Sequence, residues 1–340
     1  MKMVNAYIMQ KERFVEFINV LRARGEIIAP KSNGPDIQYL PIEDASEIDL
    51  SRIPLDCPKE YVFPMTETVF EAKDDKIIPI VESKKRVLFG IRPCDVVAFQ
   101  CLKTFFEDYF EEPKIRDSYV MDKMEKLTII AYNCPEPKEH CFCIRMGTGP
   151  VAESGFDIAL TDLGGCYLVE TGNAKGDGIV ERLSLPAATS EDKAKKEDVK
   201  KKCIEKMDVH FDIQDIEKKI YDKIDTVTEK YGEKCISCGG CNFFCPTCSC
   251  FNMSDVVDSE VIRRERFWDS CLLQGFTWLA GLGPERSTIA SRMKQRVLHK
   301  LSYTKEQYDM YSCTGCGRCS RVCPSYIFME DMIKDLLGDM

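Results

Sequence analysis

The sequence is poor in histidine. Its 340 residues contain three, His140, His210 and His299, and they lie far apart. The chain therefore has few histidine ligands for mixed Cys/His zinc or copper sites. General-base catalysis, for which histidine is the commonest side chain, is equally hard to place, and no Ser/His/Asp arrangement is apparent. We therefore predict no catalytic residue.

Excess positive charge and long apolar runs are also missing. The formal net charge is −9, which argues against a nucleic-acid-binding protein because such proteins are normally basic. The sequence contains no run of about 18 apolar residues, which is the length a helix needs to span a membrane. The first residues, MKMVNAYIMQKERF, lack the apolar segment and small-residue cleavage site of a secretory signal. We expect a cytoplasmic protein with no membrane span and no nucleic-acid partner.

Cysteine, in contrast, is abundant, with 19 residues. In an exported chain they would suggest disulfides, but cytoplasmic thiols stay reduced, so dense cysteines at short spacing favour metal binding. Exposed iron–sulfur sites are sensitive to oxygen, which points to anaerobic metabolism.

The length favours two domains. Short β-rich runs bounded by Pro, Gly, Asn or Asp predict strands in the first part, and helical spacing predicts two helices there, over 10–23 and 94–110. The predicted strands cover 26–30, 61–64, 76–80, 86–91, 127–132 and 166–170. We expect an α+β chain: an α/β domain over 1–185, a linker and charged helix over 186–233, and an all-α, helical ferredoxin-like dicluster domain over 234–340. Helical spacing over 254–310 and 326–340 supports the last.

One cysteine motif occurs twice. The spacing C-x2-C-x2-C-x3-C followed by proline starts at Cys235 and again at Cys313. In two-cluster ferredoxins the fourth cysteine of each motif binds the other cluster. The first predicted [4Fe–4S] site is therefore Cys235, Cys238, Cys241 and Cys323. The second is Cys313, Cys316, Cys319 and Cys245.

A zinc ribbon is the competing interpretation, but zinc prefers two C-x2-C pairs separated by a longer loop. The 67 residues between Cys245 and Cys313 exceed the spacing of small bacterial ferredoxins and favour a helical ferredoxin. Such a domain carries electrons and offers no open coordination position.

Four more cysteines follow predicted strands. Cys94 lies between a strand and a helix, and Cys134, Cys141 and Cys143 come after another strand. Adjacent strand ends could bring them together, and the helix N-terminus would lower the pKa of Cys94 and favour its thiolate. From spacing alone, a third cluster, another metal and ordinary thiols all stay open.

The motifs FPMTETVF, RPCD, CPEPKEHCFCIRMGTGP, CISCGGCNFFCPTCSCF, RRERFWDSC and SCTGCGRCSRVCP occur in this order. Together they resemble the iron–sulfur β subunit of cytoplasmic sulfhydrogenases and the corresponding iron–sulfur subunit of anaerobic sulfite reductase, from about residue 10 to the C-terminus. The resemblance implies a third [4Fe–4S] cluster at Cys94, Cys134, Cys141 and Cys143. It also implies electron transfer between a subunit that binds FAD and NAD(P) and a catalytic subunit, such as a [NiFe] hydrogenase or a sirohaem sulfite reductase.

We therefore expect an electron-transfer subunit of a multisubunit oxidoreductase that performs no catalysis alone. The alternative is a reductase with its own substrate site at the N-terminal cluster.

Several residues keep two interpretations. Cys248, Cys250 and Cys271 suit a further metal site or redox-active thiol, or they simply pack as small apolar residues. Cys57, Cys101, Cys166 and Cys203 have no motif around them. Arg263, Arg264 and Arg266 suggest an exposed helix face, or a basic group that holds a cluster's charge or an acidic partner.

Overall fold

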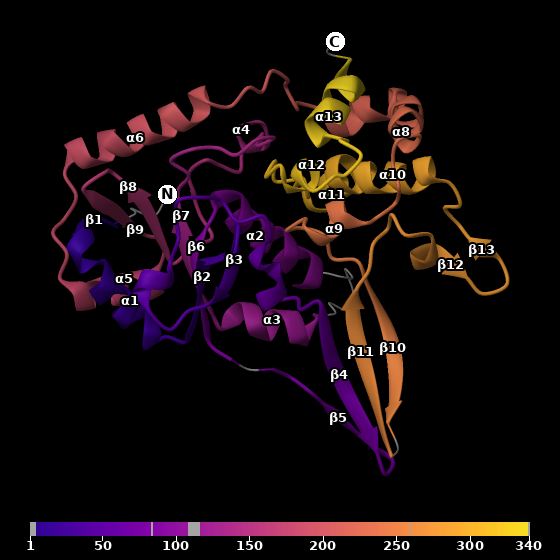
Figure 1. The fold of residues 1–340 in the computed structure, drawn as a ribbon, viewed down its shortest axis with the longest axis horizontal. Coiled ribbons are helices and arrows are strands. Elements are labelled where there is room, and N and C mark those ends of the chain that lie inside the picture. Colours follow the sequence, from indigo (N-terminus) through magenta and orange to yellow (C-terminus); the bar gives the residue numbers. More distant parts are fainter. Residues whose placement is uncertain (1–4, 83, 108–115, 259, 339–340) are drawn as a thin grey trace.

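The computed structural model describes residues 5–82, 84–107, 116–258 and 260–338, and Figure 1 shows their arrangement. The ends of two predicted helices, at 108–110 and 339–340, lie outside these residues. A broad sheet with its helices occupies one side of the molecule, and short helices occupy the other.

The largest element is a seven-stranded mixed sheet in the order β1-β9-β8-β7-β6-β2-β3. Strands β2, β6, β7 and β8 run parallel, and the remaining pairs are antiparallel. The carboxyl ends of β6 and β7 therefore meet at one edge. The strands are β1 (Asn5–Gln10), β2 (Glu26–Asn33), β3 (Asp36–Pro41), β6 (Arg86–Ile91), β7 (Leu127–Tyr132), β8 (Ile158–Asp162) and β9 (Cys166–Thr171).

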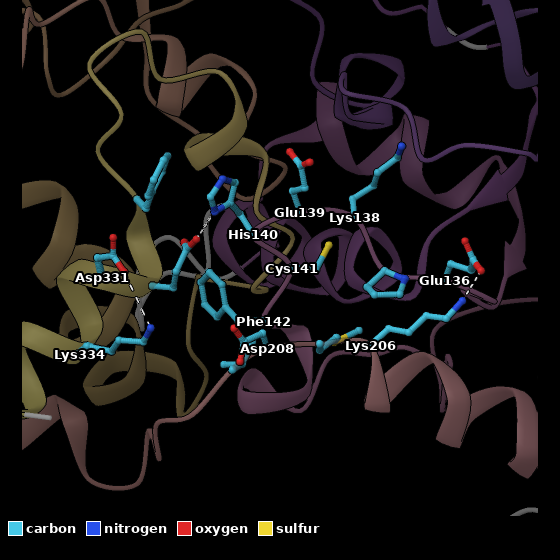
Figure 2. Close-up of a pocket in the computed structure, with 15 residues that line it drawn as sticks. Glu136, Lys138, Glu139, His140, Cys141, Phe142, Lys206, Asp208, Asp331 and Lys334 are labelled. Carbon is cyan, nitrogen blue, oxygen red and sulfur yellow. Dashed lines mark hydrogen bonds and ion pairs between the residues drawn. The ribbon is translucent and has the colours of Figure 1, made fainter. Parts of the chain in front are cut away.

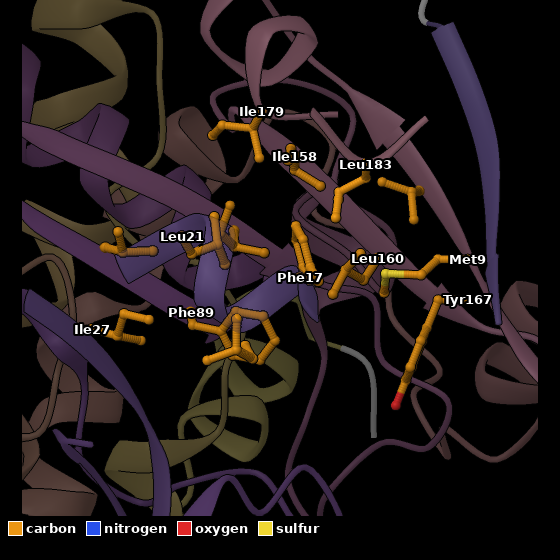
Figure 3. Close-up of a cluster of buried hydrophobic side chains, with 14 of the residues drawn as sticks. Met9, Phe17, Leu21, Ile27, Phe89, Ile158, Leu160, Tyr167, Ile179 and Leu183 are labelled. Carbon is orange, nitrogen blue, oxygen red and sulfur yellow. The ribbon is translucent and has the colours of Figure 1, made fainter. Parts of the chain in front are cut away.

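Helices cover both faces of this sheet. Successive strand residues point to opposite faces, so Val87 and Phe89 pack in one core and Leu88 in the other. The first core, drawn in Figure 3, includes α1 (Phe14–Arg22) and α5 (Ala174–Val180). The second includes α2 (Pro93–Glu107) and α3 (Ser118–Glu125). The sheet is thus a rigid frame for the loops at its edge.

The predicted all-α C-terminal domain is wrong, because residues 251–258 and 261–268 form two long strands. They build a four-stranded antiparallel sheet in the order β10-β11-β4-β5, which projects from the body in Figure 1. Its strands are β10 (Phe251–Asp258), β11 (Val261–Trp268), β4 (Thr66–Lys73) and β5 (Lys76–Pro79). A further pair, β12 (Trp278–Leu279) and β13 (Gly283–Pro284), follows.

The all-α prediction fails because β11 pairs with a strand that is distant in the sequence. Strand β11 contains β-branched and aromatic residues, which suit strands, and its partner β4 lies almost 200 residues earlier in the chain. The predicted helix face at Arg263, Arg264 and Arg266 is accordingly a strand. Arg266 is buried and forms ion pairs with Glu67 and Asp117. The strand predicted over 61–64 is also wrong, since Tyr61 ends a 3-10 turn (Pro58–Tyr61) and residues 62–64 form a turn and a bend without strand pairing.

The other helices lie mostly in the second half of the chain. They are α4 (Cys143–Met146), α6 (Ser190–Glu205), α7 (Ile216–Lys219), α8 (Ile224–Gly232), α9 (Gly240–Phe243), α10 (Ile289–Leu298), α11 (Thr304–Tyr308), α12 (Arg318–Arg321) and α13 (Met329–Leu337). A π-helical turn, His299–Tyr303, joins α10 to α11. Val227, Val297 and Ile333 belong to their common core. Over the described ranges, no helix is both long and apolar enough to cross a membrane.

Candidate metal centres

The two repeated motifs fold into the same local structure. Helices α9 and α12 each begin directly after a glycine in the left-handed region, Gly239 with φ +74° and Gly317 with φ +69°. Glycine adopts this conformation without steric cost. The fourth cysteine of each motif, Cys245 or Cys323, lies beyond the end of the short helix.

The four predicted ligands of the first site line one cavity. Cys235, Cys238 and Cys241 come from the first motif and Cys323 from the second. Cys319, a predicted ligand of the second site, and Arg296 line the same cavity, and Leu272, Met293, Met329 and Met332 make much of the remaining lining apolar. Three thiols of this set come from one motif and the fourth comes from the other. This is the exchange of fourth ligands expected for a two-cluster ferredoxin.

The predicted ligands of the second site are also near one another. Burial raises the pKa of the Cys313 thiol, and the neighbouring thiols that raise it further are Cys319, Cys245 and Cys316. Four neighbouring, partly buried thiols ionise together only when a cation or a cluster compensates their charge. This donor set suits an iron–sulfur cluster, and without one it would be costly to ionise the four thiols together.

The third set gathers where the sheet ends. Cys94 follows β6 at the start of α2, and Cys134 follows the adjacent parallel strand β7. Cys134 and Cys141 each raise the pKa of the buried Cys143 thiol, and Cys134 is one of the thiols that raise that of Cys94. Burial and then the Asp95 carboxylate raise the pKa of Cys94 well above its usual value. The prediction that the helix N-terminus lowers it was therefore wrong.

The loop of the third set interlocks with the second motif. The Phe142 amide donates to the Gly315 carbonyl at 2.8 Å, and the Thr148 hydroxyl donates to the Thr314 carbonyl at 2.6 Å. A Cβ at Gly317 would lie 2.4 Å from the His140 carbonyl oxygen. Two segments far apart in sequence thus meet at backbone contact distance, which places the second and third sets side by side.

A buried ion pair closes this junction. The Arg318 guanidinium donates to both Asp95 oxygens, at 2.6 and 2.9 Å, and each side chain is 1% exposed. Arg318 adjoins Cys319, and Asp95 adjoins Cys94. A bidentate pair of this kind holds its partners in one geometry. It therefore fixes the start of α2 against the second motif.

Five other buried cations have no carboxylate within ion-pair distance among the residues described: Arg92, Arg292 and the three described next. Arg296 donates to Asn242 Oδ1 at 2.8 Å, Lys300 to Thr247 Oγ1 at 2.7 Å, and Lys59 to the Cys248 carbonyl at 3.0 Å. Each is at most 7% exposed. A buried cation without a counter-charge costs several kcal/mol. An anionic group beside these cations, such as a thiolate-bound cluster, would remove that cost.

Sequence reasoning missed the ion pair and these cations. Arg296 and Lys300 lie on an ordinary amphipathic segment, which carries no sign that its basic side chains point inward. Only Arg318 could have been selected from the sequence, because it lies inside the cysteine motif CTGCGRC.

No three His, Cys, Asp or Glu side chains of the described ranges converge closely enough to hold a single metal ion. Zinc requires such convergence, because its ligands surround one ion at about 2.0–2.3 Å. A cubane binds its thiolates at separate iron atoms and keeps them further apart.

A pocket of about 620 Å³ opens beside the third set (Figure 2). His140 and Cys141 lie in its wall, and a hydrogen bond joins the His140 ring to the Glu330 carboxyl group. Lys138, Lys206 and Lys334 also line it. The pocket could admit a small polar molecule next to a predicted cluster ligand.

The remaining cysteines divide into two groups. Cys248, Cys250 and Cys271 lie together beside the first motif and are largely buried. Cys57, Cys101 and Cys203 are buried separately, and Cys166 is partly exposed on β9.

The sequence is similar to known proteins. A family model described as "4Fe-4S dicluster domain" matches residues 234–327. The "Sulfhydrogenase 2 subunit beta" of Pyrococcus furiosus is 30% identical over 335 residues, which cover 94% of each chain. No solved structure matches significantly.

Proposed function

The chain belongs to the family of sulfhydrogenase β subunits, and from this premise we propose that it relays electrons between two partner subunits. It is an iron–sulfur electron-transfer subunit with a [4Fe–4S] dicluster domain. One proposed partner binds FAD and NAD(P). The other is catalytic, of the [NiFe] hydrogenase or sirohaem sulfite reductase type. The complex would work in the cytoplasm, where thiols stay reduced.

One observation carries this proposal: thiols from both motifs line a single cavity. We assign Cys235, Cys238, Cys241 and Cys323 to the first [4Fe–4S] cluster. Cys313, Cys316, Cys319 and Cys245 would hold the second, and Cys94, Cys134, Cys141 and Cys143 the third. When bound, the clusters supply sites that accept and release single electrons.

The protein residues set the order of the three sites. The backbone contact between Phe142 and Gly315 supports placing the third site next to the second. The second and first are linked by the exchange of Cys245 and Cys323. Cys238, in the first set, is exposed. The proposed path therefore runs from the sheet edge, through the second site, to the surface at Cys238.

The buried side chains also serve this function. Arg296 and Lys300 bring positive charge to the thiols without a competing carboxylate among the described residues. Positive charge favours the more negative, reduced form of a cluster. The apolar lining of the first cavity limits solvent access, which also tunes potential.

A second candidate function is a reductase with its own substrate site. The pocket beside Cys141 favours it, since a small molecule there would lie next to the third set. Four cysteines at that set argue for a closed cluster without an open iron. Reduction of sulfite or polysulfide by the purified single chain with an artificial electron donor would favour the reductase. Its absence in cluster-loaded protein would favour the relay.

Iron content tests the ligand assignment. Three cubanes predict about twelve iron atoms per chain after anoxic reconstitution. Cys323→Ser should perturb the spectroscopic signal of one cluster and lower the iron by up to about four atoms. The matched control, Cys166→Ser on β9, should keep the full complement. A wild-type value that never exceeds about eight would contradict the third site.

A further inference from the structure

Arg92 lies where the seven-stranded sheet leads into two predicted ligands of the third set. It directly follows β6 and precedes Cys94 by two residues. Tyr132 ends the adjacent strand β7 and precedes Cys134 by two residues. The ends of these parallel strands are paired, and the Arg92 guanidinium lies 4.9 Å from the centre of the Tyr132 ring. Both side chains therefore belong to the wall of the third site.

Two kinds of contact fix the position of Arg92. Its backbone carbonyl caps α2, because it accepts from the Asp95 amide at 2.8 Å and from the Val96 amide at 3.0 Å. Its Nη2 atom donates to the carbonyls of Leu50 and Arg52, at 3.3 and 3.0 Å. The guanidinium is thus held in one orientation relative to the start of α2 and the ligand predicted there.

These contacts leave a charge and a donor of Arg92 unused. The residue is 1% exposed, and its side-chain hydrogen bonds among the described residues go to backbone carbonyls and not to a carboxylate. Its Nε atom is buried and has no hydrogen-bond partner in the same part of the chain. A buried N–H group without an acceptor and a buried cation without a counter-charge are both costly. Together they indicate an anionic acceptor beside Arg92.

The other fully buried basic side chains of the described ranges differ from Arg92 in one respect or the other. Arg296 has no carboxylate partner, but its Nε atom donates to Asn242 Oδ1 at 2.8 Å. Arg318 has a buried Nε atom without a partner, but the Asp95 carboxylate balances its charge. Arg92 lacks both the carboxylate and the Nε acceptor. Its contacts with the polypeptide therefore explain its position and not its charge.

The third thiol set is the anionic group next to Arg92. Burial raises the pKa of the Cys134 thiol to about 11, and the Arg92 charge is the largest influence that opposes this rise. The potential of an iron–sulfur cluster depends on nearby charge and on hydrogen bonds to its sulfur atoms. Positive charge favours the reduced form, because that form is the more negative one.

We propose that Arg92 directs its buried charge and its free Nε–H group at the third thiol set and thereby raises the reduction potential of the cluster assigned there. Arg92 is not a ligand, and its guanidinium stays protonated while the site gains or loses one electron. The site is then a better electron acceptor than the same four thiols would make without Arg92. The inference rests on the proposed function, and in particular on the third cluster.

The test compares variants of the anoxically reconstituted full chain in an EPR-monitored redox titration. The signal of the third cluster is identified as the one that Cys134→Ser perturbs. Arg92→Met removes the charge and the donor and should weaken electron binding at this signal about tenfold, which is a shift of about 59 mV to lower potential. Arg92→Lys keeps the charge and should shift the same signal by less than half as much.

Arg86 provides a matched control at the other end of β6. Its guanidinium also lies over a tyrosine ring, that of Tyr61 at 5.8 Å, but it forms ion pairs with Glu26 and Glu82. Arg86 begins this six-residue strand and Arg92 follows its end, so a rise of about 3.3 Å per residue separates them by about 20 Å. Arg86→Met should therefore leave all three cluster potentials unchanged.

Iron content, measured in the same samples, separates the possible failures. A wild-type chain that never exceeds about eight iron atoms would contradict the third cluster and with it that part of the proposed function. Full iron content with no shift in Arg92→Met would overturn the inference alone. Equal shifts in Arg92→Met and Arg92→Lys would also overturn it, because the charge would then not be the cause.

A further variant covers the case in which Arg92→Met loses the third cluster. Arg92→Gln then takes its place in the titration, with the same expected shift, because glutamine is uncharged but still polar. Loss of about four iron atoms in all three Arg92 variants would overturn the inference, because Arg92 would then be needed to assemble the site and not to set its potential.

Discussion

Replacing Arg318 by methionine tests the junction between the sheet edge and the second motif. The substitution keeps much of the volume but leaves the Asp95 carboxylate buried without its partner. Both side chains are 1% exposed, and two hydrogen bonds are lost. Breaking a buried pair from one side costs about 3–5 kcal/mol. We expect Arg318→Met to lower the free energy of unfolding by that amount.

The chain contains a matched control for burial. Arg264 also donates two hydrogen bonds to one carboxylate, that of Asp255, at 2.7 Å each, but these side chains are 42% and 45% exposed. Exposed pairs contribute about 0–1 kcal/mol. Arg264→Met should therefore change stability little, although it removes the same chemical groups.

Thermal unfolding of the anoxic, cluster-loaded chain measures the difference at one fixed scan rate, because cofactor-bearing proteins need not unfold reversibly. An unfolding entropy of about 2.1 cal/mol/K per residue gives about 0.7 kcal/mol/K for 340 residues. Arg318→Met should then lower the midpoint by about 4–7 °C, and Arg264→Met by about 1 °C or less. Equal shifts for both variants would refute the reasoning. Adding Asp95→Leu to Arg318→Met should restore part of the loss, since no unpaired charge remains.

Three further predictions use other features of the same region. Gly317→Ala should destabilise the chain more than Gly147→Ala in the same unfolding assay, because both have φ near +68° but only Gly317 has a carbonyl, that of His140, in the way; equal losses would contradict the close approach. Burial lowers the pKa of His299 to about 4, so its stabilising effect is complete above about pH 6.5 and is lost as the pH falls towards 4. Between pH 7 and 5 the wild type should lose about 2 kcal/mol more than His299→Gln, and parallel midpoint shifts would argue against this. Lys300→Met should make one cluster potential more negative in an EPR-monitored titration, whereas the exposed control Lys294→Met should not.

Local patterns predicted the parts of the fold whose signals are local. The strands expected over 86–91 and 127–132 occur at those residues, since each is a short apolar run bounded by turn residues. The dicluster domain expected from the repeated spacing is confirmed by the family match over 234–327. Spacing is a strong signal because a cluster constrains which residue types can recur at which positions.

The features that were predicted wrongly or missed depend on tertiary contacts and not on local sequence. Strand β11 is stabilised by β4, which precedes it by almost 200 residues, so no window of local sequence contains both partners. The pKa of Cys94 was predicted from its helix N-terminus, but burial and the Asp95 carboxylate outweigh the helix dipole. Arg296 and Lys300 could not be identified from sequence, because inward orientation of a basic side chain depends on tertiary contacts.

The long segment between the two motifs has a structural consequence. It contains β10 and β11, and the pairing of β11 with β4 ties the first motif to the N-terminal part of the chain. The second motif is tied to the same part by Gly315, Gly317 and Arg318. Both motifs are therefore held by contacts with the N-terminal part of the chain, the first through the four-stranded sheet and the second through loops at the edge of the seven-stranded sheet. Distances between electron carriers would then depend on residues outside the dicluster domain, such as Asp95, as much as on the motifs themselves.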